Sequence, residues 1–138
     1  MNPVRITMKV SYDGQEAELQ TMSGVRHERD GKIYLQFMQT ISTEGASTPT
    51  LLIVENSTVR VHRKGDYASD FLFDIDNRHP VTYNTPMGAL PMETDTRQLD
   101  LFISDEILKI KMRYNLMSND QIMTAVDMII HAVVEQHI

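Results

Sequence analysis

Apolar and polar residues alternate along most of this chain, and the alternation is clearest in its C-terminal quarter. Every second residue from 108 to 116 is apolar, and the residues between them are charged or polar. Because a β-strand points successive side chains to opposite faces, this period of two predicts a strand with one buried face. Its apolar positions are Leu108, Ile110, Met112, Tyr114 and Leu116.

A second strand is expected to fold back on the first across the Ser-Asn-Asp turn at residues 118–120. If Leu116 faces Ile122, each inward residue of one strand meets an inward residue of the other, as a buried face requires. The same register places Lys111 opposite Asp127, an attractive pair of charges across the two strands. We therefore expect an antiparallel hairpin that ends near residue 134.

An α-helix is the alternative for the second half of this hairpin. Ser118 and Gln121 fit a capping box, and a stripe of apolar residues follows at helical spacing. Apolar residues would, however, cover nearly the whole circumference of that helix, which is unlike a surface helix. The density of β-branched residues and the Lys111–Asp127 pair therefore favour a strand. The helical stripe would be Ile122, Val126, Ile129 and Val133.

The same alternation, interrupted by turn-forming residues, predicts further short strands in the rest of the chain. Asp13-Gly14 and Asp30-Gly31 indicate tight turns, and residues 42–50 indicate a loop. Gly24 marks a position for a bulge or a sharp bend inside an extended segment. The expected strands are residues 4–12, 17–29, 32–40, 51–55, 59–63, 71–73, 81–85, 88–96 and 99–103.

Two of these predictions say which side chains face the core. In the third strand we expect Ile33, Leu35 and Phe37 to point inward. Residues 56–58 would form a turn of odd length, which keeps one set of apolar residues on a single face. That inward set is Leu51, Ile53, Val59 and Val61.

About ten short strands with tight turns predict an all-β fold, an antiparallel barrel or sandwich. The chain has 138 residues and fits one domain, residues 1–138. A closed sheet has no exposed edges, and a barrel of about eight strands is either filled by side chains or holds one small ligand. We therefore expect a single barrel of about 8–10 strands.

Composition narrows the function classes. The formal net charge of −6 opposes non-specific binding to nucleic acid or to an anionic membrane surface. The absence of cysteine excludes disulfides and thiolate metal sites, and it fits a reducing cytoplasm. No apolar run reaches a membrane span, and the first ten residues alternate, unlike the apolar centre of a secretory signal.

Several short motifs, in their order and spacing, resemble the YwiB-like family of small uncharacterised bacterial proteins, mostly from Firmicutes. The resemblance covers nearly the whole chain. It implies a calycin-type or lipocalin-like β-barrel in which residues 123–134 form the closing strand, and it implies no particular activity. The motifs are Gly31-Lys32-Ile33-Tyr34-Leu35, Val59-Arg60-Val61-His62-Arg63-Lys64-Gly65, Tyr83-Asn84-Thr85-Pro86-Met87-Gly88, Thr94-Asp95-Thr96 and Lys109-Ile110-Lys111-Met112-Arg113-Tyr114.

Arg63 is the first candidate for a binding residue. It follows Val59 and Val61 at two-residue spacing, so its side chain is expected to point to the same face, into the barrel near one of its open ends. A guanidinium there could hold a carboxylate or a phosphate of a ligand. The structural alternative is an arginine that pairs with a carboxylate of the protein or extends its head group to water.

Hydroxyl and methionine side chains on the expected inner strands are the other candidates. Convergent hydroxyls in an apolar cavity would orient a small ligand, and methionine would adapt the wall to its shape. The structural alternative is that threonine and tyrosine simply suit a pleated surface and that methionine fills the core. The candidates are Tyr83, Thr85, Thr94, Met112 and Tyr114.

Metal binding and catalysis have little support. Asp70, Asp74, Asp76 and His79 lie close in sequence, but without the spacing of a calcium loop. The five histidines form no zinc motif, and neither a nucleophile elbow nor a nucleotide-binding loop is present. We expect no cofactor, no metal site and no catalytic residue that the sequence can identify.

These observations favour a cytoplasmic barrel that binds a small apolar or amphipathic ligand in its interior, with Arg63 and Tyr114 as polar contacts. The alternative is a filled barrel that acts through its outer surface as a protein-interaction or dimerisation module. Neither nucleic acid nor a membrane is an expected partner.

Overall fold

The computed structural model describes residues 1–40, 47–65, 68–85 and 87–135, apart from the side chains of Thr40, Tyr83 and Thr85. These residues form ten β-strands and no helix, so none of them forms a helix able to span a membrane. The strands are β1 (Asn2–Tyr12), β2 (Glu18–Arg29), β3 (Lys32–Thr40), β4 (Ser47–Glu55), β5 (Thr58–Arg63), β6 (Ser69–Asp74), β7 (Arg78–Thr85), β8 (Gly88–Ile103), β9 (Ile107–Ser118) and β10 (Gln121–Val134).

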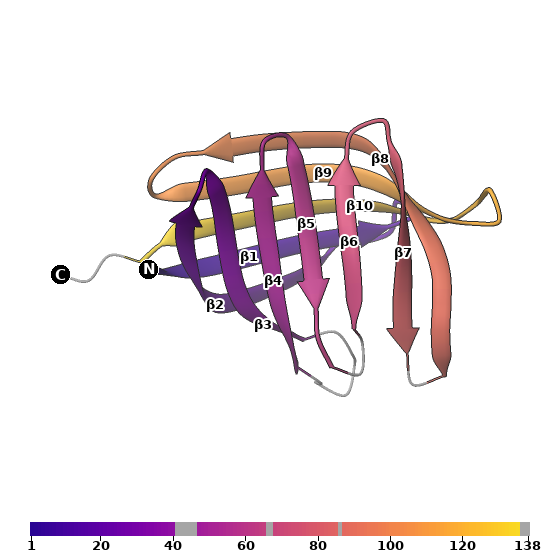
Figure 1. Cartoon of the computed structure of the whole chain (residues 1–138), viewed down its shortest axis with the longest axis horizontal. Coiled ribbons are helices and arrows are strands. Elements are labelled where there is room, and N and C mark those ends of the chain that lie inside the picture. Colours follow the sequence, from indigo (N-terminus) through magenta and orange to yellow (C-terminus); the bar gives the residue numbers. More distant parts are fainter. Residues whose placement is uncertain (41–46, 66–67, 86, 136–138) are drawn as a thin grey trace.

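All ten strands belong to one antiparallel sheet, in the order β6-β5-β4-β3-β2-β1-β10-β9-β8-β7. The first and the last strand of the chain, β1 and β10, pair along nine residues in the middle of this order. The sheet curls until its two end strands, β6 and β7, lie beside one another (Figure 1). The result is a nearly closed all-β barrel, as the alternation of the sequence predicts.

The core is made by the inward residues of each strand. Successive residues of β9 alternate between buried and exposed from Leu108 to Tyr114, and β1 and β3 do the same. Ile33, Leu35 and Phe37 are all buried, which confirms their predicted direction. Residues 121–134 form a strand, so the helical alternative for this segment is wrong.

The C-terminal hairpin has the predicted partners but a different register. Asn119 and Asp120, both at positive φ, form a two-residue turn that pairs Ser118 with Gln121. A bulge at Met123 then shifts the register once more. The shorter turn and the bulge each shift the pairing by one residue. Because the total shift is two residues, the same side chains still face inward.

The residue pairs across the hairpin change with this register. Leu116 faces Thr124 rather than Ile122, and Asp127 faces Arg113 rather than Lys111. Arg113 Nε lies 2.8 Å from Asp127 Oδ1. The expected Lys111–Asp127 pair is therefore wrong, although a charge pair does form across these two strands.

The predicted inward set in β4 is also wrong. Asn56 and Ser57 form a two-residue turn, with Asn56 at positive φ, so Glu55 pairs with Thr58. Shortening the turn by one residue moves every side chain of β4 to the opposite face. The buried apolar residues of β4 are accordingly Leu52 and Val54, and not Leu51 and Ile53.

Three other boundaries differ from the prediction. Residues 88–103 are one strand, β8, with a bulge between Thr96 and Gln98, where two strands were expected. The expected loop at 42–50 is shorter, because residues 47–50 belong to β4, and residues 42–46 lie outside the described part of the chain. At Gly24 no bulge interrupts the pairing with β1, and the pairing with β3 begins at this residue.

Close packing explains the glycine at position 24. A Cβ atom there would lie 2.6 Å from the carbonyl oxygen of Gln36 and 2.9 Å from Ile6 Cδ1. Contacts this short between non-bonded atoms are repulsive, so the barrel wall has no room for a side chain at this point.

Candidate functional site

The two end strands of the sheet, β6 and β7, form the seam of the barrel. They are consecutive in the chain and are tied at both ends. At the turn, Asn77 N donates to the carbonyl oxygen of Asp74 (3.1 Å), and at the far end Asn84 N donates to that of Ala68 (3.1 Å). Between these ties the described residues of the two strands form no ladder. Pro80 contributes to this, because proline has no N–H to donate.

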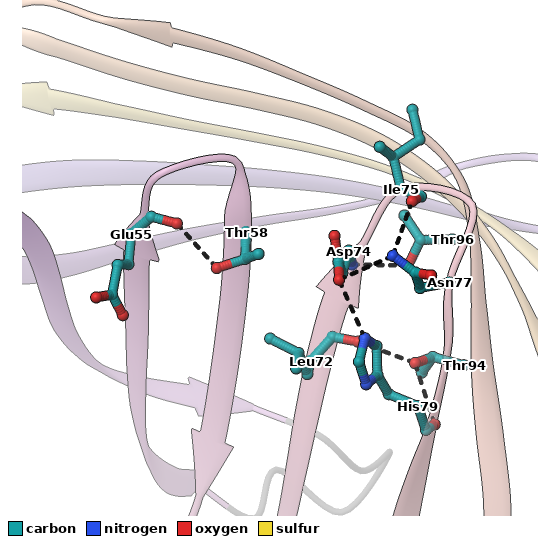
Figure 2. Close-up of polar contacts among 9 residues, drawn as sticks. All are labelled: Glu55, Thr58, Leu72, Asp74, Ile75, Asn77, His79, Thr94 and Thr96. Atoms are coloured by element: carbon teal, nitrogen blue, oxygen red, sulfur yellow. Dashed lines mark hydrogen bonds and ion pairs between the residues drawn. The ribbon is translucent and has the colours of Figure 1, made fainter.

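Two threonines of β8 bridge the seam with their side chains (Figure 2). Thr94 is fully buried, and its Oγ1 lies 3.0 Å from the carbonyl oxygen of Leu72 and 3.4 Å from that of His79. Thr96 Oγ1 accepts a hydrogen bond from the backbone N–H of Asp74 at 3.3 Å. These side-chain hydrogen bonds connect β6 to β8 and β7, in place of the backbone hydrogen bonds of a ladder.

Acidic and imidazole side chains meet at the turn end of the seam. His79 Nε2 lies 3.3 Å from Asp74 Oδ2, and the same oxygen accepts a hydrogen bond from Asn77 Nδ2 at 3.0 Å (Figure 2). Among the described residues, no three His, Asp or Glu side chains gather as metal ligands would. These interactions therefore stabilise the turn between β6 and β7.

Below this turn the seam opens into a cleft of about 510 Å³. One wall is formed by β5 and β6 and the other by β7. Its lining combines cationic, hydroxyl and apolar groups, so it could contact both ends of an amphipathic molecule. The lining residues that matter most here are Arg60, Arg63, Ser69, Asp70, Leu72, His79, Val81 and Thr82.

One polar group of the cleft wall stands out. Ser69 is 5% exposed, and its hydroxyl has no hydrogen-bond partner among the described residues. A buried hydroxyl without a partner is unfavourable, since it has given up its hydrogen bonds to water. Arg60 is differently placed: its Nη1 lies 3.0 Å from both carboxylate oxygens of Asp70 at the rim.

Arg63 lies where the cleft meets the barrel interior. It is half-buried on the same face as Val59 and Val61, the direction predicted from its parity. Its Nε donates to Gln39 Oε1 at 3.0 Å, and its guanidinium lies 5.5 Å from the centre of the Phe71 ring. Arg63 lines both the cleft and a small internal cavity.

That internal cavity measures only about 20 Å³, which is room for about one water molecule. Tyr114 forms part of its wall and packs against Phe73, with ring centres 4.6 Å apart. Met112 is 1% exposed and belongs to the surrounding core. Side chains of the described residues therefore fill the barrel axis at the position where the sequence suggested a ligand.

The candidate residues consequently separate into three groups. Arg63 lines the cleft, Thr94 bridges the seam, and Met112 and Tyr114 belong to the core. Tyr83 and Thr85 lie on β7, with side chains outside the described part of the chain. The sequence did not lead us to expect a cleft lined by Ser69, Asp70, His79 and Thr82. The available signal was Pro80 in β7, because proline in a strand indicates a sheet edge.

The geometry defines a class: an antiparallel β-barrel with a filled axis and an incompletely paired seam that opens into a cleft. Residues 4–130 match the family model described as "Domain of unknown function (DUF1934)", and the chain belongs to this family. The ywiB protein from Bacillus subtilis has a similar crystal structure, with a TM-score of 0.86 and 18% sequence identity over 98% of this chain and 93% of that one. At this identity the likeness concerns the fold, and it agrees with the YwiB-like resemblance of the sequence. A search of curated proteins found no match.

Proposed function

We propose that this protein binds a small amphipathic molecule in the cleft between β6 and β7, and not along the axis of the barrel. The observation that carries the proposal is the contrast in volume, about 510 Å³ in the cleft against about 20 Å³ inside. Ligand-binding clefts usually span roughly 300 to 1,000 Å³, so the cleft has a suitable size and the internal cavity does not.

The chemistry of the cleft wall supports an amphipathic ligand. Leu72 and Val81 offer apolar surface, and Arg63 offers a cation at the inner end, where Phe71 backs its guanidinium. The Ser69 hydroxyl would gain a hydrogen-bond partner from a polar group of the ligand. This keeps Arg63 as a predicted polar contact and replaces Tyr114 with Ser69.

The direct test is native mass spectrometry of freshly purified protein, followed by extraction and identification of any copurified molecule. Octanoate and octanol serve as defined probes in a thermal-shift assay on the same preparation. We expect either a bound mass or an increase in melting temperature with a probe, since a ligand that binds the native state stabilises it.

Two matched variants locate the site. Thr82→Trp places an indole in the cleft, whereas Thr21→Trp places one on the exposed outer face of β2. We expect Thr82→Trp to abolish the bound mass or the probe shift and Thr21→Trp to retain it. No bound mass and no shift in the unmodified protein, or equal behaviour of the two variants, would contradict the proposal.

The filled barrel axis specifically favours a second candidate, a protein-interaction or dimerisation module. In that case the fold is a scaffold, and its outer surface carries the function. Sedimentation equilibrium over a hundredfold range of concentration tests the dimer directly. A mass that stays at that of one chain, 15.8 kDa, would exclude self-association in this range.

We further infer a calycin-like relationship for the barrel and a cytoplasmic location. The strand order, in which every two paired strands except β1 and β10 are consecutive in the chain, supports the first. The chain contains no cysteine, which suits a reducing compartment and supports the second. Fractionation of cells that express a tagged chain is the test of location.

A further inference from the structure

The outer face of β1, β10 and β9 carries a concentration of positive charge that the cleft does not explain. These three strands pair side by side at the centre of the sheet (Figure 1). Their inward residues form the core, so their outward residues face solvent together. The outward cationic residues are Arg5, Lys9, Lys109, Lys111 and Arg113, and His131 lies among them.

The register sets the spacing of the central cations. Lys9 and Lys111 both pair with Ile129, one from each side, and Lys109 pairs with His131. Neighbouring strands lie about 4.8 Å apart, so the backbones of Lys9 and Lys111 are about 10 Å apart, and those of Lys109 and Lys111 about 7 Å apart. We call Lys9, Lys109 and Lys111 the lysine triangle.

The lysine triangle differs from the cations at its border. Arg113 lies 2.8 Å from Asp127, whose hydrogen bond and charge raise the pKa of the guanidinium above its ordinary value. Arg5 lies 3.9 Å from Glu135. The three lysines form no ion pair with the described residues and are exposed. Two carboxylates border the triangle, since Asp100 of β8 pairs with Lys111 across the ladder and Asp127 pairs with Arg113, but among the described residues neither forms an ion pair with a lysine of the triangle.

This local charge is opposite to that of the whole molecule. The chain has a formal net charge of −6, so the surface outside this face is more strongly acidic still. A long polyanion such as nucleic acid would extend beyond the triangle onto that acidic surface and be repelled. A short acidic segment, with two or three carboxylates spaced like the lysines, can contact the lysines without extending onto that surface. Ile129 is half-buried at the centre of the triangle and offers apolar contact between the charges.

We propose that the outer face of β1, β10 and β9 docks an acidic segment of a partner protein, with Lys9, Lys109 and Lys111 as the principal contacts. Complementary charge on such a surface speeds encounter and selects partners, and binding weakens as salt screens it. This interaction surface lies on strands other than β5, β6 and β7, which line the cleft, and the proposal stands whether or not the cleft binds a ligand.

The test measures fluorescence anisotropy of a fluorescein-labelled decaglutamate peptide with the full chain at low ionic strength. The charge-reversal variant Lys9→Glu/Lys109→Glu/Lys111→Glu removes the triangle. Its matched control, Arg29→Glu/Lys32→Glu/Lys64→Glu, makes the same change in net charge at residues outside this face. A neutral variant, Lys9→Gln/Lys109→Gln/Lys111→Gln, avoids the added repulsion, and circular dichroism checks that each variant is folded.

We expect saturable binding of the peptide that weakens as salt is raised, and at least a tenfold loss of affinity in both triangle variants. The control should lose less than threefold. Absence of peptide binding at low salt, or an equal loss in the control and the triangle variants, would overturn the proposal. Tighter binding of a fluorescein-labelled ten-nucleotide oligothymidylate than of the peptide would overturn it as well, because the partner would then be a nucleic acid.

Discussion

Replacement of Thr94 by valine tests whether side-chain hydrogen bonds hold the seam together. The two side chains have nearly the same shape, so the substitution removes a hydroxyl and leaves little cavity. In the structure this hydroxyl is fully buried and lies 3.0 Å from the carbonyl oxygen of Leu72, across the seam. The variant should therefore be less stable, and its β6–β7 seam should open more often.

The size of the effect follows from the environment of the bond. A net hydrogen bond contributes about 1 kcal/mol to stability, and a carbonyl left poorly solvated costs roughly 1 to 2 kcal/mol more. A valine methyl group recovers part of this by burying apolar surface. We expect the free energy of unfolding to fall by about 1 to 3 kcal/mol, which moves the urea midpoint by on the order of 1 M.

Thr58 provides a matched control within the same sheet (Figure 2). Its Oγ1 also lies close to a carbonyl oxygen, that of Glu55 at 2.8 Å, but the pair is exposed to water. Water can replace this bond, so Thr58→Val should cost less than about 0.5 kcal/mol. Both variants gain the same β-propensity, which cancels in the comparison. Urea unfolding followed by circular dichroism measures both, and equal losses in the two variants would refute the role given to Thr94.

The remaining predictions concern other parts of the barrel. Gly24→Ala should lower the free energy of unfolding by about 1 to 3 kcal/mol in the same urea assay, because the new Cβ would lie 2.6 Å from a backbone oxygen, and an unchanged midpoint would contradict this. Ile110→Ala, at a fully buried position, should cost about 2 to 5 kcal/mol, and a loss below about 1 would mean that the core is loosely packed. Arg63→Ala should reduce the affinity for octanoate at least fivefold by isothermal titration calorimetry and leave octanol binding within twofold, whereas equal losses would deny Arg63 the role of a charged contact.

Much of the fold could be predicted from alternation alone. Period-two patterns located most of the strands and the inward faces of β3 and β9, because burial of one face constrains every second residue. The direction of Arg63 followed from the same rule. Alternation also decided correctly against a helix after residue 120.

The errors came from turn lengths, which alternation does not determine. Asn56-Ser57 and Asn119-Asp120 are two-residue turns in which at least one residue adopts positive φ, a conformation that asparagine and aspartate tolerate. One residue too many in the first turn exchanged the two faces of β4. In the second, the bulge at Met123 compensated the error and preserved the faces.

The cleft could not be predicted, because it depends on how the ends of the sheet meet. Ser69 and His79 are ten residues apart in sequence, and nothing in their local patterns indicates that they line one opening. That opening exists because β6 and β7 approach without forming a ladder, which is a consequence of the curl of all ten strands. Pro80 was the one local signal of an edge.

We propose that ligand binds at the seam between β6 and β7, and not along the barrel axis. Titration of the ¹⁵N-labelled chain with octanoate, followed by amide chemical shifts, tests it most directly. If the seam binds the probe, saturable shifts are expected at Ser69, Asp70, His79 and Thr82 on the two walls of the cleft. Shifts that concentrate instead on core residues such as Met112 and Ile130, or no shifts up to the solubility limit of the probe, would contradict it.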